Sequence, residues 1–193
     1  MTRMMRRPTG RAGQSIAEFA LVLPILAVIL ASILEFGLAF DADLAIEAAS
    51  REGVRAGASL GNGGSNGVCP FGTVDDASAG IDAQILKTIK ASLTSAGLDM
   101  GGVGVLIYLA AANGNPTAGK TNTFTWNGAG FTKTSGSWTA CGRHDGTFGG
   151  GIYDGIGVQI TYTYVTKTGI LTFLGGHINM VAQTVMPIGP PWH

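Results

Sequence analysis

The sequence predicts an α+β protein in which one long N-terminal helix crosses a membrane and continues as a spine into a small head. Three features support this class. A long apolar run follows a basic leader, a helical pattern continues past that run, and short alternating segments then surround one amphipathic stretch. The expected divisions are a cleaved cytoplasmic leader at 1–13, a transmembrane and spine helix at 14–60, and an extracytoplasmic head at 61–193. The head should hold an antiparallel sheet and one or two helices.

The leader and the apolar run predict a single-pass membrane protein. The leader contains four arginines and no acidic residue: Arg3, Arg6, Arg7 and Arg11. Positive charge marks the cytoplasmic side, so the head is expected outside. Residues 19–34 carry no charge, and a helix extended to Phe40 would be about 33 Å long at about 1.5 Å per residue. Glu35 would then lie near the outer interface, where its carboxylate reaches headgroups or water.

The start of the apolar run contains a candidate processing site. Gly13 resists helix formation and has no side chain, which suits a protease that needs an extended peptide. A secretory signal would instead end its apolar region in a small-residue site, and none follows this run. Cleavage between Gly13 and Gln14 would leave a mature chain that keeps the apolar helix. The alternative is an uncut signal anchor.

Glu18 and Phe19 lie at the head of the apolar helix. A carboxylate at the edge of a hydrocarbon layer is costly unless it is paired. Cleavage at Gly13 would place a new ammonium group on Gln14, about one helical turn from Glu18. We therefore expect Glu18 to act in processing or assembly, the alternative being that it reaches the cytoplasmic interface alone.

These residues resemble the TadE-like family of minor pilins, part of the Tad (tight adherence) pilus and secretion machinery. The matching features are the pair Glu18-Phe19, the pair Leu23-Pro24 inside the apolar run, a second E-F-G at 35–37, and A-S-R-E-G-V-R-A at 49–56. Together they are specific, although any one of them alone would be a weak signal.

The resemblance implies a structural protein without enzymatic activity or cofactor. A prepilin peptidase would cut between Gly13 and Gln14, and the glutamate at position 18 would pair with the N-terminal amine of a neighbouring subunit. The implied partners are the peptidase, other pilin and minor pilin subunits, the inner-membrane Tad assembly platform and membrane lipid. The implied location is the inner membrane, and after assembly the surface of an adhesive pilus.

The head is expected to combine one helix with several strands. A helix is predicted over 81–96, where apolar residues recur every four positions and Gly97 ends the pattern. Strands are predicted at 103–112, 121–126, 131–140, 157–165 and 178–186, with a short apolar turn at 170–174. The sheet should be antiparallel, with helices on one side.

Charge and cysteine content narrow the function further. The leader holds four of the twelve basic residues and none of the twelve acidic ones, so the remainder has a net charge of −4 and no basic stripe for nucleic acid. Cys69 and Cys141 both lie on the predicted outside and predict one disulfide. A thiol nucleophile beside His144 and Asp145 is disfavoured, because adjacency in sequence does not create triad geometry.

One motif favours a different class of protein. Residues 114–121 match the phosphate-loop pattern GxxxxGK[ST], but that chemistry needs a helix to begin at the lysine. Residues 122–126 read as a strand, so a hairpin loop without nucleotide is expected. The histidines are far apart and predict no metal site. The alternative function is a signal-anchored ligand-binding or enzymatic domain, and a third reading is a membrane anchor that serves as an assembly platform.

Overall fold

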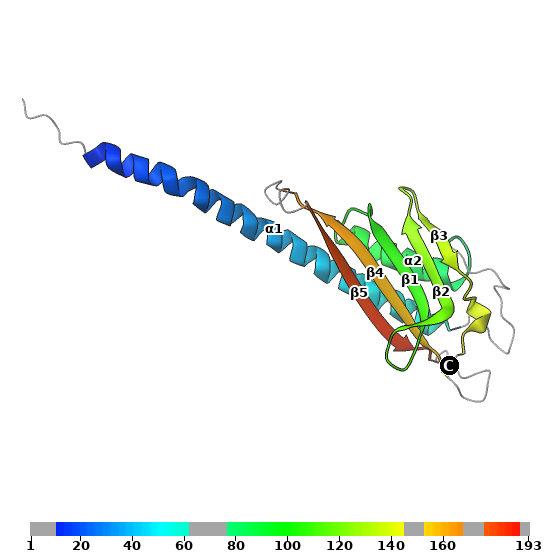
Figure 1. Cartoon of the computed structure of the whole chain (residues 1–193). Helices are drawn as coiled ribbons and strands as arrows, with labels where there is room; N and C mark the ends of the chain where they lie inside the picture. The colour runs from blue at the N-terminus through cyan, green and yellow to red at the C-terminus, as the bar shows by residue number, and fades with distance from the viewer. Residues whose placement is uncertain (1–10, 62–76, 145–152, 168–175, 190–193) are drawn as a thin grey trace, which may run out of the picture.

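The computed structural model describes residues 11–61, 77–144, 153–167 and 176–189 of the 193. One long helix projects from a head in which a sheet lies beside the second half of that helix and a second helix (Figure 1). The predicted α+β class is confirmed, including the long N-terminal helix that enters the head.

Helix α1 (Arg11–Leu60) is a single helix of 50 residues with two different halves. It begins three residues before the predicted start and ends where the sequence predicts. The first half contacts no other described element and is exposed on all sides, whereas the second half buries one stripe against the head. The buried positions of this stripe are Ala39, Ala42, Ile46, Ala49, Ser50, Gly53, Val54 and Gly57.

The head contains a five-stranded antiparallel sheet. Its strands are β1 (Val103–Ala110), β2 (Pro116–Trp126), β3 (Phe131–Gly136), β4 (Gly155–Val165) and β5 (His177–Pro187). The spatial order is β3-β2-β1-β4-β5, and every neighbouring pair is antiparallel. All five predicted strands are present, while the predicted apolar turn at 170–174 lies outside the described residues.

Strand β3 ends four residues earlier than predicted. Gly136 has φ of +104°, a conformation that favours glycine, and a Cβ at this position would collide with the backbone of strand β2. The chain then turns inward, so Trp138 is buried and a short 3₁₀ helix, η1 (Ala140–Gly142), follows.

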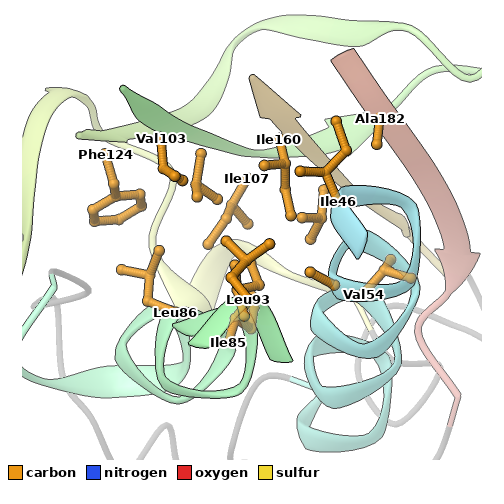
Figure 2. Packing of buried hydrophobic residues seen from close by; sticks show 14 of the residues in the cluster. Ile46, Val54, Ile85, Leu86, Leu93, Val103, Ile107, Phe124, Ile160 and Ala182 are labelled. Carbon is orange, nitrogen blue, oxygen red and sulfur yellow. The ribbon is translucent and has the colours of Figure 1, made fainter. Parts of the chain in front are cut away.

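Helices α1 and α2 (Gly80–Ser95) cover the same face of the sheet (Figure 1). Figure 2 shows the core between them, with side chains of β1, β2 and β4 meeting those of both helices. On β4 the predicted alternation is confirmed, because Val158, Ile160, Tyr162 and Tyr164 are buried. The opposite face of the sheet is more exposed and carries mainly uncharged polar side chains.

The end of α2 is fixed by a Schellman motif around Gly97. The Leu98 amide donates to Leu93 O over 3.1 Å, and the Gly97 amide donates to Thr94 O over 3.0 Å. Gly97 has φ of +73°, the left-handed conformation in which glycine commonly ends a helix. The predicted helix end at Gly97 is therefore confirmed.

Two glycines allow α1 to approach α2 and the sheet closely. A Cβ at Gly53 would lie 2.7 Å from Ile89 Cγ1, and one at Gly57 would lie 2.7 Å from Ile156 Cδ1 and 2.8 Å from Ile85 Cδ1. No larger residue fits at these crossings without displacing core side chains. The spine therefore contains glycine at positions where helix propensity alone would disfavour it.

Replacing Gly53 with leucine should destabilise the head by about 1–3 kcal/mol, because the added side chain overpacks the α1–α2 contact. Thermal unfolding of the full chain in detergent measures the effect. Gly37→Leu is the matched control, since a Cβ at Gly37 meets nothing within 4 Å. Equal melting temperatures for the two variants would contradict the close approach at Gly53.

Candidate processing and membrane-anchoring site

The predicted cleavage site lies in the first turns of α1. Gly13 is helical, and a Cβ there would meet nothing within 4 Å. This differs from the extended conformation expected for Gly13. Gln14 Nε2 donates a hydrogen bond of 3.1 Å to Glu18 Oε1, and Phe19 beside it is 64% exposed. Arg3, Arg6 and Arg7 lie outside the described residues.

The first half of α1 presents an apolar surface that no described element covers. Every residue from 13 to 30 is exposed, and the large apolar side chains between Ile16 and Leu34 are 48% to 71% exposed. Among the described residues, α1 is the one helix long and apolar enough to cross a membrane. Because water disfavours an apolar surface of this extent, it indicates a membrane anchor.

Glu35 is buried at the point where α1 reaches the head. Its side chain is fully enclosed, and Oε1 accepts hydrogen bonds of 2.8 Å from both Tyr164 Oη and the Lys167 backbone amide. The expectation that Glu35 reaches headgroups or water is therefore wrong. The physical reason is that the end of β4 folds over this carboxylate and supplies the donors that water would otherwise provide.

The hydroxyl that bonds Glu35 is held in its protonated form. Burial and the neighbouring carboxylate raise the pKa of Tyr164 from its ordinary 10.0 to about 12. Ionisation of this phenol would remove the donor and place two negative oxygens side by side, so the bond requires a neutral tyrosine.

A shallow apolar groove lies next to this junction, between α1 and β5. It encloses about 280 Å³ and is lined by Phe36, Ala39, Phe40, Asp43, Ile178 and Met180. Phe36 is 50% exposed and Phe40 is 68% exposed. The apolar surface of the first half of α1 thus continues onto the head.

Comparison with known protein families gives a match for the N-terminal part of the chain. Residues 13–55 match the family model described as TadE-like protein. The N-terminal segment is similar to the TadE-like family. This confirms the resemblance inferred from the sequence. Neither a curated protein nor a solved structure matches the chain.

The end of the TadE-like segment is the surface on which the head packs. Ser50 Oγ lies 3.0 Å from both Val158 O and Thr184 Oγ1, which joins α1 to β4 and β5. Gly53 and Val54 are buried, whereas Arg51 is exposed. Packing of the head on α1 therefore explains the small or apolar residues at positions 49, 50, 53 and 54.

A buried polar cluster in the head was not predicted from the sequence. Arg143 Nη2 lies 2.6 Å from Asp82 Oδ1, and Asn122 Nδ2 donates to Asp82 Oδ2 over 2.6 Å. The Arg143 guanidinium stacks over the Trp138 ring at 4.4 Å from its centroid. Asp82 and Arg143 are 61 positions apart, so no local pattern signals the pair. It fixes the irregular segment that contains Cys141.

The cysteine and histidine predictions have different outcomes. Cys141 is not a free thiol, but Cys69 lies outside the described residues, so their pairing remains a prediction. The backbone amide of His144 donates to Asp154 Oδ2 over 2.8 Å, and His144 Nδ1 lies 3.1 Å from the same oxygen. Asp145, the acid considered for a triad, is not among the described residues.

The phosphate-loop match is part of the sheet. Strand β2 begins at Pro116, so Lys120 lies exposed within a strand and not at the start of a helix. The predicted absence of a helix after the lysine is confirmed, although the strand starts earlier than expected. Within the matched segment, Pro116 and Thr121 are the partners of Ala110 and Tyr108 in β1.

The Glu35–Tyr164 bond predicts a loss of stability at alkaline pH. The pKa of Tyr164 is raised to about 12 in the folded chain, so its contribution is complete below about pH 10, the value for an unfolded tyrosine, and is lost as the pH rises towards 12. Denaturant unfolding between pH 8 and 11.5 measures this slope.

Tyr164→Phe should be less stable than the parent at pH 8 by about 1–3 kcal/mol, because a buried acceptor loses its donor. The difference should shrink above pH 10. Burial also raises the pKa of Tyr108 and Tyr162, so Tyr108→Phe serves as the control for a general tyrosine effect. A Tyr164→Phe deficit that is constant across the range would contradict the assignment.

Proposed function

We propose that this chain is a minor pilin of a Tad-type system, a structural subunit that a prepilin peptidase processes before assembly. The observation that supports this most strongly is the TadE-like match over residues 13–55, which coincides with a helix exposed along its apolar half. The N-terminus faces the cytoplasm, because Arg3, Arg6, Arg7 and Arg11 precede the span. The head is on the extracytoplasmic side of the inner membrane.

The peptidase cuts between Gly13 and Gln14. Gly13 is helical, so the first turns of α1 must unwind to present an extended peptide. That unwinding is easy because the described residues there make no tertiary contacts, and because glycine costs about 1 kcal/mol relative to alanine in a helix. A side chain at this position would both favour the helix and fill the space that the protease approaches.

Glu18 acts after the cut. Its carboxylate already accepts a hydrogen bond from the Gln14 side chain at 3.1 Å, so the two residues lie on one face of the helix, one turn apart. The new ammonium group of Gln14 would offer a stronger, charge-assisted donor to a carboxylate at the membrane edge. In an assembled subunit, Glu18 pairs with the amine of a neighbouring copy or of another pilin.

The head serves as an exposed module held by the spine, with a disulfide between Cys69 and Cys141 in the oxidising space outside the membrane. The partners are other pilin subunits and the inner-membrane assembly platform. The alternative class, a signal-anchored binding or enzymatic domain, was favoured only by the match at 114–121. Residues 116–121 of that segment lie in strand β2 and no helix begins at Lys120, which weakens the argument for nucleotide.

Processing is tested by the N-terminal sequence and intact mass of the protein from cells with and without the peptidase. The chain should begin at Gln14 only when the peptidase is present. Gly13→Phe should reduce cleavage at least about tenfold, because the side chain would block the unhindered site that glycine provides.

The control is Gly37→Phe, a second glycine of α1 whose Cβ position is equally open. It should be trimmed like the parent. Unchanged trimming of the Gly13 variant would exclude the proposed cleavage site. An uncut Met1 chain in both strains would leave the signal-anchor alternative.

Glu18→Gln should leave membrane insertion unchanged but reduce incorporation into pili, because an amide cannot form the ion pair with an N-terminal ammonium. Quantifying the subunit in sheared pili and in membranes measures both steps. Glu47→Gln is the control, since Glu47 forms an exposed pair of 2.8 Å with Arg51 on the same helix. Incorporation of the Glu18 variant at the parent level would count against pairing.

A further inference from the structure

The charge-free part of α1 is too short to cross a bilayer by itself. Residues 19–34 are sixteen residues, which make about 24 Å of helix, whereas the hydrocarbon layer is about 30 Å thick. Residues after Leu34 must therefore also lie in the hydrocarbon layer, or the bilayer must become thinner around the helix. The next residue is Glu35, which would normally end an apolar span.

Glu35 does not end the span, because the head encloses its charge. The carboxylate is fully buried and accepts hydrogen bonds of 2.8 Å from Tyr164 and the Lys167 amide. A carboxylate satisfied inside the protein does not need water or headgroups. From Phe19 to Phe40 there is no other charged residue, so the span can continue past Glu35.

The surface around Glu35 is apolar on both the helix and the sheet. Phe36, Leu38 and Phe40 are 50%, 48% and 68% exposed. Ile178 and Met180 of β5 line the groove beside Phe36 and Phe40. This surface is continuous with the membrane-facing half of α1, because the residues follow directly along the same helix.

Charged groups mark where this apolar surface ends. Asp41 is exposed directly after Phe40, and Asp43, which is partly exposed, is the one charged residue among the described residues that line the groove. The interval from Phe19 to Phe40 is 22 residues, or about 33 Å of helix, which matches the hydrocarbon layer of about 30 Å. Lys167 is exposed beside Glu35, where a long side chain can extend to phosphate headgroups.

We propose that the membrane-proximal end of the head is inserted into the lipid, with acyl chains of the leaflet on the head side occupying the groove between Phe36, Phe40, Ile178 and Met180. The head is thus partly embedded and not held above the membrane by a free stretch of helix. The proposal rests on the membrane anchor of the proposed function, but not on cleavage at Gly13 or on assembly into pili.

Photocrosslinking of the full, uncut chain tests the proposal. The photoreactive residue p-benzoylphenylalanine replaces Leu26, Phe40, Met180 or Val185 in turn, in vesicles of phosphatidylethanolamine and radiolabelled phosphatidylglycerol. Leu26 is the control within the span. Val185 is 38% exposed on the same strand as Met180 but towards its other end, and serves as the control outside the membrane.

Phe40 and Met180 should give about tenfold more lipid adduct than Val185 and a yield similar to Leu26, because acyl chains are confined to the layer of about 30 Å. Adducts to a second copy of the chain at Phe40, without lipid adduct, would overturn the proposal in favour of a protein partner. Lipid adduct at Leu26 alone would place the head above the membrane. No adduct at Leu26 would instead refute the membrane anchor, and the proposed function with it.

Discussion

The burial of Glu35 under the end of β4 is the contact on which the relation between anchor and head depends. The carboxylate needs donors because it is fully buried in the protein, and Tyr164 and the Lys167 amide supply them. A buried acceptor without donors would cost several kcal/mol. The need for these donors therefore sets the position of the head along α1. That position in turn sets the length of helix available to cross the membrane.

A single helix meets two environments, and its composition changes accordingly. Between Phe19 and Leu34 the side chains are apolar on every face apart from Ser32, as a helix surrounded by lipid requires. After it, one stripe of small and apolar residues packs on the sheet and on α2, while charged residues such as Arg51 and Arg55 remain exposed. The TadE-like match spans both regions and ends at residue 55. It thus covers the anchor and most of the surface on which the head packs, but not the head itself.

Within the head, the buried pair of Asp82 and Arg143 stabilises the irregular segment that follows strand β3. Burying both charges is costly, and their close contact together with Asn122 compensates for that cost. The pair connects α2 to the segment around Cys141, beyond the end of β3.

The sequence by itself determined the long helix, the antiparallel sheet and the end of α2, because period-3.6 and period-2 patterns and the turn glycine at 97 act locally. It also identified the TadE-like segment from residues close together in the chain. The tertiary structure alone decided the fate of Glu35, whose partner Tyr164 lies 129 positions away, and the inward turn after Gly136. Such contacts depend on which distant backbone reaches a given side chain, and that is set by the packing of the sheet on the helix and not by any local pattern.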